Sequence, residues 1–223
     1  FTFENNAKTI DVQVTGKSVV INGDEHKDDP NYYRTVTQTI NYNYPNQPSQ
    51  PVVSSRTFVR NATVNEVTGE VVKYSDWSTA PDFIARPVQT IPGYTVQVTN
   101  GDGQVVQLVN GQIPAEAVNE NSANTVYNVN YTAQTLSFKI NYINQANNQV
   151  VQSYTISGKP DQTVTINAPI PENWQVVAGQ TVPKEGDYKF GNVAPSDMNV
   201  LIEPQTISGN QQGNQDNPDL YRT

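Results

Sequence analysis

The segment Thr35–Pro45 constrains the fold most, because its pattern returns 100 positions later at Thr135–Asn144. Over 35–44 and 135–142, apolar or aromatic side chains occupy the even positions and polar ones occupy the odd positions, with Gln38 as the one exception. This alternation is typical of a strand that is buried on one face. Because the triplet Ile-Asn-Tyr at 40–42 and at 140–142 coincides in register, we expect each copy to be the first strand of a separate β-rich domain.

A chain of 223 residues can hold two small domains, each with its own core. Hydrophobic residues make up only 35% of it, so we expect thin cores with wide polar faces. Turn signals at Asn100–Gly103 and Asn147-Asn148 predict hairpins. Further strands are predicted within 52–63, 71–74, 95–98, 105–109, 126–132, 150–156, 163–166 and 198–202.

Three other segments carry local signals. Ile10, Val12 and Val14 alternate with polar residues and predict a strand over 9–14. The acidic stretch 22–31 ends in Asp-Asp-Pro and is typical of a linker. Residues 77–84 could form one short helix, with Ser78 or Thr79 as the cap and Pro81 in the first turn.

The two ends of the chain match each other. Pro30–Thr35 returns 188 positions later as Pro218–Thr223, and at the same shift Val12 and Val14 fall on Val200 and Ile202. A tandem repeat of this length indicates a long parent protein built from such units. We expect the end strand of a preceding unit and a linker over 1–34, a first domain over 35–133, a second over 134–204, and a linker to the next unit over 205–223. Whether residues 1–21 pack with this unit or a preceding one stays open.

The charge and the absence of cysteine exclude several classes. Asp and Glu outnumber Lys and Arg by 21 to 13, and the net charge of -8 argues against a nucleic-acid partner. Without cysteine there is no disulfide framework, thiol nucleophile or sulfur-based zinc site. No apolar run of about 18 residues occurs, so we expect no membrane insertion, and any export signal or wall anchor would lie outside this sequence.

Catalytic residues are not expected. The only histidine, His26, lies in the predicted linker, where a Ser-His-Asp arrangement would need a flexible segment. A pair of carboxylates beside an aromatic ring could support glycoside hydrolysis. Four acidic residues near Tyr74 and Trp77 could supply that pair, although we interpret them as solvated turn residues: Glu66, Glu70, Asp76 and Asp82.

No cofactor is expected, and calcium is the one metal that the sequence makes plausible. Asp24-Glu25 with Asp28-Asp29, and Asn100–Gly103, offer oxygen ligands, but neither has the spacing of a calcium loop. One period later the positions of the first group hold Gln212-Gly213 and Asp216-Asn217, which removes most of its charge.

Aromatic side chains are the best candidates for ligand contacts, because rings stack on sugars and anchor protein interfaces, although in thin sheets they are more often core. Tyr42, Tyr127, Tyr131 and Tyr142 alternate along predicted strands, so we assign them to the core or its edge. Trp77 is the first choice for an accessible ring. The predicted ligand-binding residues are Trp77, Tyr74, Asp76, Asp82 and Trp174. Exposed sheet edges are an alternative binding surface.

Several motifs together resemble a known family. VNEVTGEVV at 64–72, Trp77, IPGY at 91–94 and VYNVNYT at 126–132 are similar to the first domain of the mucus-binding protein (Mub) repeats of lactic-acid bacteria. INYIN at 140–144 and SYTISGKPDQTV at 153–164 resemble the MucBP module, which is the second domain of those repeats. The resemblance implies two ubiquitin-like β-grasp domains end to end, hence a β-rich α+β fold. It also implies an extracellular, cell-wall-anchored adhesin of Gram-positive bacteria that binds mucin glycans and, for some repeats, immunoglobulins.

Three functional hypotheses follow. The first is a non-enzymatic adhesin repeat that binds mucin glycoproteins, acts with adjacent repeats and gains avidity by multivalency. The second is a structural spacer that presents a distal adhesive tip, and it predicts no binding by this unit. The third is a carbohydrate-active enzyme, which would lose its activity when Glu66 or Glu70 is replaced.

Overall fold

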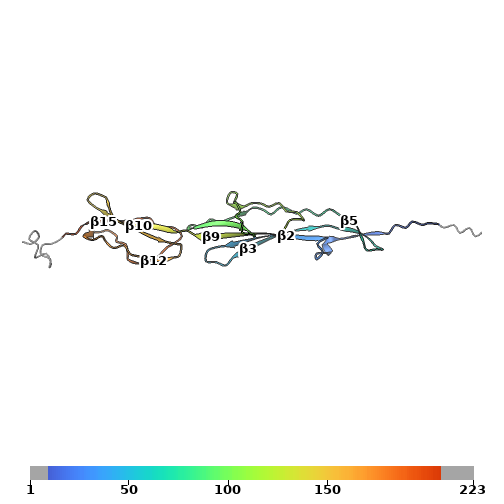
Figure 1. Ribbon diagram of the computed structural model, residues 1–223, viewed down its shortest axis with the longest axis horizontal. Coiled ribbons are helices and arrows are strands. Elements are labelled where there is room, and N and C mark those ends of the chain that lie inside the picture. The colour runs from blue at the N-terminus through green and yellow to red at the C-terminus, as the bar shows by residue number, and fades with distance from the viewer. Residues whose placement is uncertain (1–9, 207–223) are drawn as a thin grey trace, which may run out of the picture. The chain divides into compact units, whose positions relative to one another are not determined.

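The computed structural model describes residues 10–206, and nearly all of this range is strand and connecting loop (Figure 1). The one helix within it is a short 3-10 helix, η1 (Gly23–Glu25). A β-rich fold is therefore confirmed, whereas the helix predicted over 77–84 is wrong, because this segment is loop with an isolated bridge at Phe83. No helix between residues 10 and 206 is long and apolar enough to cross a lipid bilayer.

The chain divides into two compact units. Within the described residues, the first comprises 10–89 together with Gln97–Asn130, and the second comprises Thr90–Val96 and 131–206. The strands, in chain order, are β1 (Ser18–Ile21), β2 (Tyr33–Asn43), β3 (Gln50–Val59), β4 (Ala62–Asn65), β5 (Val71–Tyr74), β6 (Arg86–Pro87), β7 (Tyr94–Asn100), β8 (Gln112–Ile113), β9 (Thr125–Ala133), β10 (Leu136–Asn144), β11 (Val150–Gly158), β12 (Thr163–Ile166), β13 (Trp174–Val176), β14 (Gly186–Lys189) and β15 (Met198–Pro204).

The main sheet of the first unit is built around β2. Its order is β3-β2-β9-β7, with β3 antiparallel and β9 parallel to β2. The alternation predicted for β2 is confirmed, because Val36, Gln38, Ile40 and Tyr42 are buried while the residues between them are not. A second sheet, β1-β4-β5, and the small pair β6-β8 complete the described strands of this unit.

The main sheet of the second unit repeats this plan around β10. Its order is β11-β10-β15-β13, with β11 antiparallel and β15 parallel to β10. Ile140 is fully buried, as Ile40 is. The two copies of the Ile-Asn-Tyr triplet therefore hold equivalent places, each on a strand with a hairpin partner on one side and a parallel partner on the other. The separate two-stranded sheet β12-β14 contributes the buried Ile166 and the partly buried Val164 and Tyr188 to the same core.

The equivalence of the two sheets extends to single hydrogen bonds. The hydroxyl of Tyr42 donates to the Pro87 carbonyl at 3.2 Å, and the hydroxyl of Tyr142 donates to the Ala168 carbonyl at 2.6 Å. In both units a buried tyrosine thus ties the central strand to a distant segment, which is β6 in the first unit and the loop after β12 in the second. The neighbouring asparagines also pair across the parallel strands, Asn41 with Asn128 and Asn141 with Asn199.

Three other expectations need correction or refinement. Residues 10–17 form no strand within this chain, and Ile10, Val12 and Val14 are exposed, so the described part of the strand predicted over 9–14 is not paired here. After the turn at 100–103 only isolated bridges form, at Val105 and Val109, and the strand predicted over 105–109 is absent. The segment 22–31 contains η1, whose cap Asn22 accepts a hydrogen bond from the Asp24 N–H.

Candidate functional site

Arg60 and the two aromatic rings it contacts form the centre of the candidate site in the first unit. Arg60 follows the last residue of β3, Tyr74 ends β5, and Trp77 lies in the loop that leaves β5. The guanidinium carbon of Arg60 lies 3.9 Å from the centre of the Tyr74 ring and 4.5 Å from the centre of the Trp77 ring. Such cation–π contacts orient the guanidinium plane and hold both rings in place.

Further side chains extend this arrangement in both directions. The Arg34 guanidinium lies 5.5 Å from the Trp77 ring, and the Tyr32 ring meets Tyr74 edge-on at 5.7 Å. The His26 ring follows Tyr32 at 5.0 Å. We call the whole set the arginine–aromatic cluster, and it consists of His26, Arg34, Tyr32, Tyr74, Arg60 and Trp77.

Two serines position Trp77 and explain why no helix forms there. The Ser75 amide donates to the Asn61 carbonyl and its hydroxyl accepts from the Asn61 amide. Ser78 makes the same two bonds with the backbone of Val59. Because these bonds occupy the amides and hydroxyls that would begin and cap a helix, the loop runs extended beside the end of β3.

The edge of the Arg60 guanidinium remains available to a ligand. Within residues 10–206 its one hydrogen bond runs from Nε to the Asn31 carbonyl at 2.6 Å, which leaves both terminal nitrogens without an acceptor. The cluster is also a local concentration of positive charge in an acidic chain. Every arginine of the described range belongs to the first unit: Arg34, Arg56, Arg60 and Arg86.

A hollow of about 450 Å³ adjoins Tyr74. It is lined by residues of β1, β4 and β5 and by the loop that begins at Ser75, and Asp76 and Lys73 contribute the charged groups. Tyr74 is 37% exposed and Asp76 is exposed, so both are accessible from solvent. The ring of Trp77 is half-buried, because it also packs against the core residues Phe58 and Phe83.

The structure thus brings together three of the five residues predicted from the sequence. Tyr74 is the last residue of β5, and Asp76 and Trp77 lie in the loop that follows it. Asp82 has a structural role, because its carboxylate accepts from the Val118 amide and its carbonyl accepts from Arg56. Trp174 belongs to the second unit, where it is half-buried on β13 and packs against the core.

The acidic residues considered for catalysis or metal binding have ordinary surface surroundings. Glu66 pairs with Lys17 at 3.5 Å, and Glu70 accepts a bond from Thr68 within the turn between β4 and β5. Asp29 accepts from the Asn31 amide, and Asn100 organises the turn at 100–104. Within 10–206, no three His, Cys, Asp or Glu side chains gather into a set that could hold a metal ion.

Gly23 controls the position of Arg60. A Cβ atom at this buried glycine would lie 2.2 Å from the Arg60 carbonyl oxygen and 2.8 Å from Val59 Cγ1. We expect Gly23→Ala to displace the end of β3 and to lower the free energy of unfolding of the first unit by about 1–2 kcal/mol. Thermal unfolding followed by Trp77 fluorescence measures the change. Gly101→Ala is the matched control, because its Cβ would meet only Val126 at 3.6 Å; equal losses in the two variants would contradict the packing argument.

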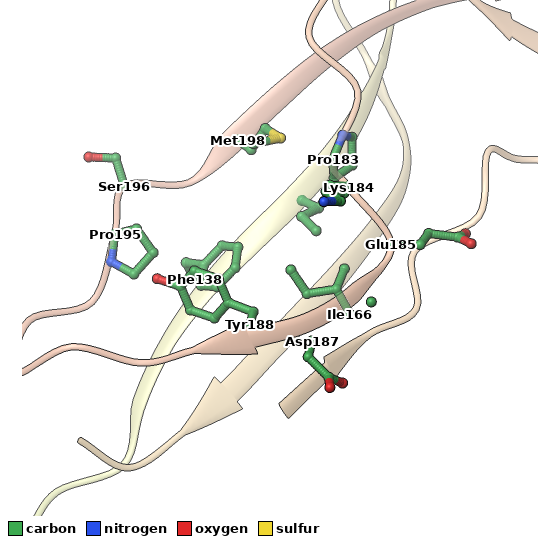
Figure 2. Close-up of a pocket in the computed structure, with 12 residues that line it drawn as sticks. Phe138, Ile166, Pro183, Lys184, Glu185, Asp187, Tyr188, Pro195, Ser196 and Met198 are labelled. Carbon is green, nitrogen blue, oxygen red and sulfur yellow. The ribbon is translucent and has the colours of Figure 1, made fainter. Parts of the chain in front are cut away.

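The second unit contains a hollow that the sequence did not indicate. It measures about 500 Å³ and lies between β10 and β15 on one side and the two-stranded sheet β12-β14 on the other. Figure 2 shows the rings of Phe138 and Tyr188 and the side chains of Ile166 and Met198 around it, while the carboxylates of Glu185 and Asp187 point outward. Its apolar residues come from four separate strands, so no local motif could have predicted them.

Comparison with known families decides what kind of domain carries the cluster. The family model of the Muc B2-like domain matches residues 27–135. Just under half of the chain is therefore similar to the Muc B2-like domain. The matched range includes every member of the arginine–aromatic cluster except His26. The family resemblance predicted from the sequence motifs is thereby confirmed.

Solved structures of mucus- and mucin-binding proteins are also similar to the chain. The crystal structure of Mub-RV is 28% identical, with 53% of this chain and 60% of that chain covered and a TM-score of 0.38. The mucin-binding domain of Spr1345 from Streptococcus pneumoniae is 19% identical over 53% of this chain and 97% of that one, with a TM-score of 0.36. The type 2 repeat of the mucus binding protein MUB from Lactobacillus reuteri is 23% identical over 52% and 59%, with a TM-score of 0.32. No curated protein sequence matches the chain.

Proposed function

We propose that the chain is an extracellular adhesin unit that binds mucin glycoproteins and has no catalytic role. The observation that carries this proposal is the match of residues 27–135 to the Muc B2-like domain. The arginine–aromatic cluster lies in the same range, and its chemistry suits glycans. Rings present apolar faces on which sugars stack, and a guanidinium fixed by stacking can bind an anionic or hydroxyl oxygen through its free N–H groups.

Binding is assigned to Tyr74, Trp77 and Arg60, with Asp76 beside them in the hollow. The ring of Tyr74 is the most accessible of these groups, since it is 37% exposed and lines the hollow. Trp77 is half-buried and supports Arg60 from the side of the core. Asp82 and Trp174 remain predicted ligand contacts of lower priority, because their observed contacts are within the protein.

We expect Tyr74→Ala to weaken binding to purified mucin about tenfold or more, as for a central aromatic contact. Tyr74→Phe keeps the ring and should stay within about twofold of the wild type. Surface plasmon resonance of the full chain on immobilised mucin measures both, and thermal unfolding shows whether the variants are folded. An unchanged affinity of a folded Tyr74→Ala variant would rule out this surface, and no binding by the wild-type chain would favour the spacer function instead.

The larger architecture is part of the proposal. The order β3-β2-β9-β7 and its repeat in β11-β10-β15-β13 have the central parallel pair of a β-grasp sheet without its helix, so we propose two helix-poor β-grasp domains over 35–133 and 134–204. The repeat of 188 positions supports a tandem array in a cell-wall-anchored protein, where weak contacts of each unit add up. Two linked copies of the chain should then bind mucin more tightly than one, and equal affinities would exclude a multivalent mechanism.

Immunoglobulins are a second proposed partner of the same unit. An external strand could pair with an edge of either larger sheet of the first unit. The edge strands are β3 and β7 in one sheet and β1 and β5 in the other. The same sensor experiment with immobilised immunoglobulin tests this. Binding that survives Tyr74→Ala would assign it to a surface other than the arginine–aromatic cluster.

A further inference from the structure

Residues 10–16 have the side-chain pattern of a strand but belong to no sheet in the described structure. Ile10, Val12 and Val14 are 78%, 73% and 87% exposed. All three are β-branched and occupy alternate positions, so an extended backbone would place them on one face. Three such side chains in water are unfavourable unless a sheet covers them.

The repeat within the sequence identifies what kind of sheet this is. At the shift of 188 positions that relates the two ends of the chain, residues 10–16 fall on Met198–Pro204, which is strand β15. Val12 and Val14 take the places of Val200 and Ile202, both fully buried. The exposed face of 10–16 therefore corresponds to the face that β15 buries in the core of the second unit.

The place of β15 sets strict requirements. It lies in the middle of the sheet, parallel to β10 and antiparallel to β13. Val200 and Ile202 pack in the core cluster that also contains Tyr142 and Phe138. A strand that occupies this position pairs on both edges and needs an apolar residue at every second position, and the one proline of β15, Pro204, is its last residue.

Residues 10–16 meet these requirements one by one. Ile10 replaces Met198, Val12 replaces an identical valine, and Val14 is one methylene smaller than Ile202. On the opposite face, Asn199 accepts a hydrogen bond from Asn141 Nδ2 at 2.8 Å. Asp11 takes the place of Asn199, and its carboxylate can accept the same bond.

We infer that residues 10–16 are the central strand of another sheet built like that of the second unit. The partner is a unit of the same fold that presents one strand like β10 and one like β13, with the position between them open. Residues 10–16 would enter parallel to the first and antiparallel to the second. This inference concerns assembly and does not depend on the proposed binding of mucin.

The surroundings of Gly16 and Lys17 support a close junction between such a partner and the first unit. Only Lys17 separates the segment 10–16 from the start of β1 at Ser18. The Lys17 carbonyl accepts from the Glu66 amide at 2.9 Å, and a Cβ at Gly16 would lie 2.7 Å from the Asn65 side chain. Because the chain is already fixed to the turn after β4 at this point, the joined sheet would follow the first unit without a flexible linker.

A graft in the full chain tests whether the segment is a β15-type strand. The grafted variant carries Met198→Ile, Asn199→Asp, Leu201→Gln, Ile202→Val, Glu203→Thr and Pro204→Gly, so that β15 has the sequence of residues 10–16. We expect the second unit to keep a cooperative unfolding transition, followed by Trp174 fluorescence, because the buried alternation is preserved. The control variant carries the same seven residue types shifted by one position, which places polar side chains in the core. A graft that loses its transition as the control does would overturn the inference.

Complementation tests docking between molecules. Val200→Asp in the full chain puts a charge in the core and should abolish the native signal of Trp174. A peptide with the sequence of residues 10–16 should restore that signal, as should a peptide of residues 198–204. A peptide of residues 10–16 with Val12→Asp and Val14→Asp should not. Restoration by the 198–204 peptide without restoration by the 10–16 peptide would contradict the proposed docking.

Discussion

Replacing Tyr142 with alanine should lower the free energy of unfolding of the second unit by about 3–5 kcal/mol. The side chain is the largest of those that are almost fully buried, with 1% of its surface exposed, and its hydroxyl donates to the Ala168 carbonyl at 2.6 Å. The substitution removes the ring from the middle of the core and leaves that carbonyl without a partner.

The two tryptophans make this measurement specific. The chain has only two, and Trp77 belongs to the first unit while Trp174 packs against the core that contains Tyr142. In a Trp77→Phe background, Trp174 alone reports chemical unfolding of the second unit. The result expected for Tyr142→Phe is a loss of only about 1 kcal/mol, because the ring remains and one hydrogen bond is lost. Equal losses for the alanine and phenylalanine variants would show that the ring contributes little.

Alkaline unfolding gives an independent readout of the same residue. Burial raises the pKa of Tyr142, and Tyr154 and Glu185 add to the effect. The folded state therefore favours the neutral phenol. The resulting contribution of Tyr142 to the free energy of unfolding is complete below the pKa of an unfolded tyrosine, about 10. It is lost as the pH rises through the pKa of Tyr142 in the folded state. The stability of the wild-type second unit should fall more steeply above about pH 10 than that of Tyr142→Phe. Parallel curves for the two proteins would contradict this assignment.

The sequence predicted the repeated sheets because their signal is local and strong. The alternation in 35–45 and 135–144 specifies both the strand and the buried face, and a short hairpin connection brings in each neighbour. The same alternation at 9–14 does not produce a strand within this chain, since a strand also needs a partner and the described structure offers none there. Periodicity reports which face a strand would bury, whereas pairing depends on residues far away in the sequence.

The candidate site was only partly predictable for a related reason. Tyr74 and Trp77 were found because aromatic residues stand out in a polar loop, but the role of Arg60 depends on contacts across β3, β5 and the following loop. The helix predicted over 77–84 was wrong because Ser75 and Ser78, which resemble cap residues, bond to the backbone at the end of β3 instead. These serines bond to backbone groups far away in the sequence instead of capping a local helix, and the local sequence pattern cannot predict that choice.

Glu116→Ala is expected to lower the free energy of unfolding of the first unit by about 2–3 kcal/mol. The carboxylate accepts three hydrogen bonds, from Gln38 Nε2 at 2.9 Å, Thr125 Oγ1 at 3.1 Å and the Tyr127 hydroxyl at 3.3 Å. Gln38 is only 2% exposed, so its amide would be left in the core without an acceptor. This bond also explains the one polar exception in the alternation of β2, which no sequence pattern could explain because Glu116 lies 78 positions away.

The double variant Gln38→Leu/Glu116→Leu separates the cost of an unpaired amide from the value of the bond itself. When both partners become apolar no buried donor is left over, and Thr125 and Tyr127 are half-buried rather than enclosed. We therefore expect the double variant to be more stable than Glu116→Ala, in chemical unfolding followed by Trp77 fluorescence in a Trp174→Phe background. If the double variant were the less stable of the two, an unpaired Gln38 amide would not be the main cause of the loss in Glu116→Ala. The expected order would instead mean that β2 tolerates a polar residue at its centre only because a carboxylate from a distant loop satisfies it.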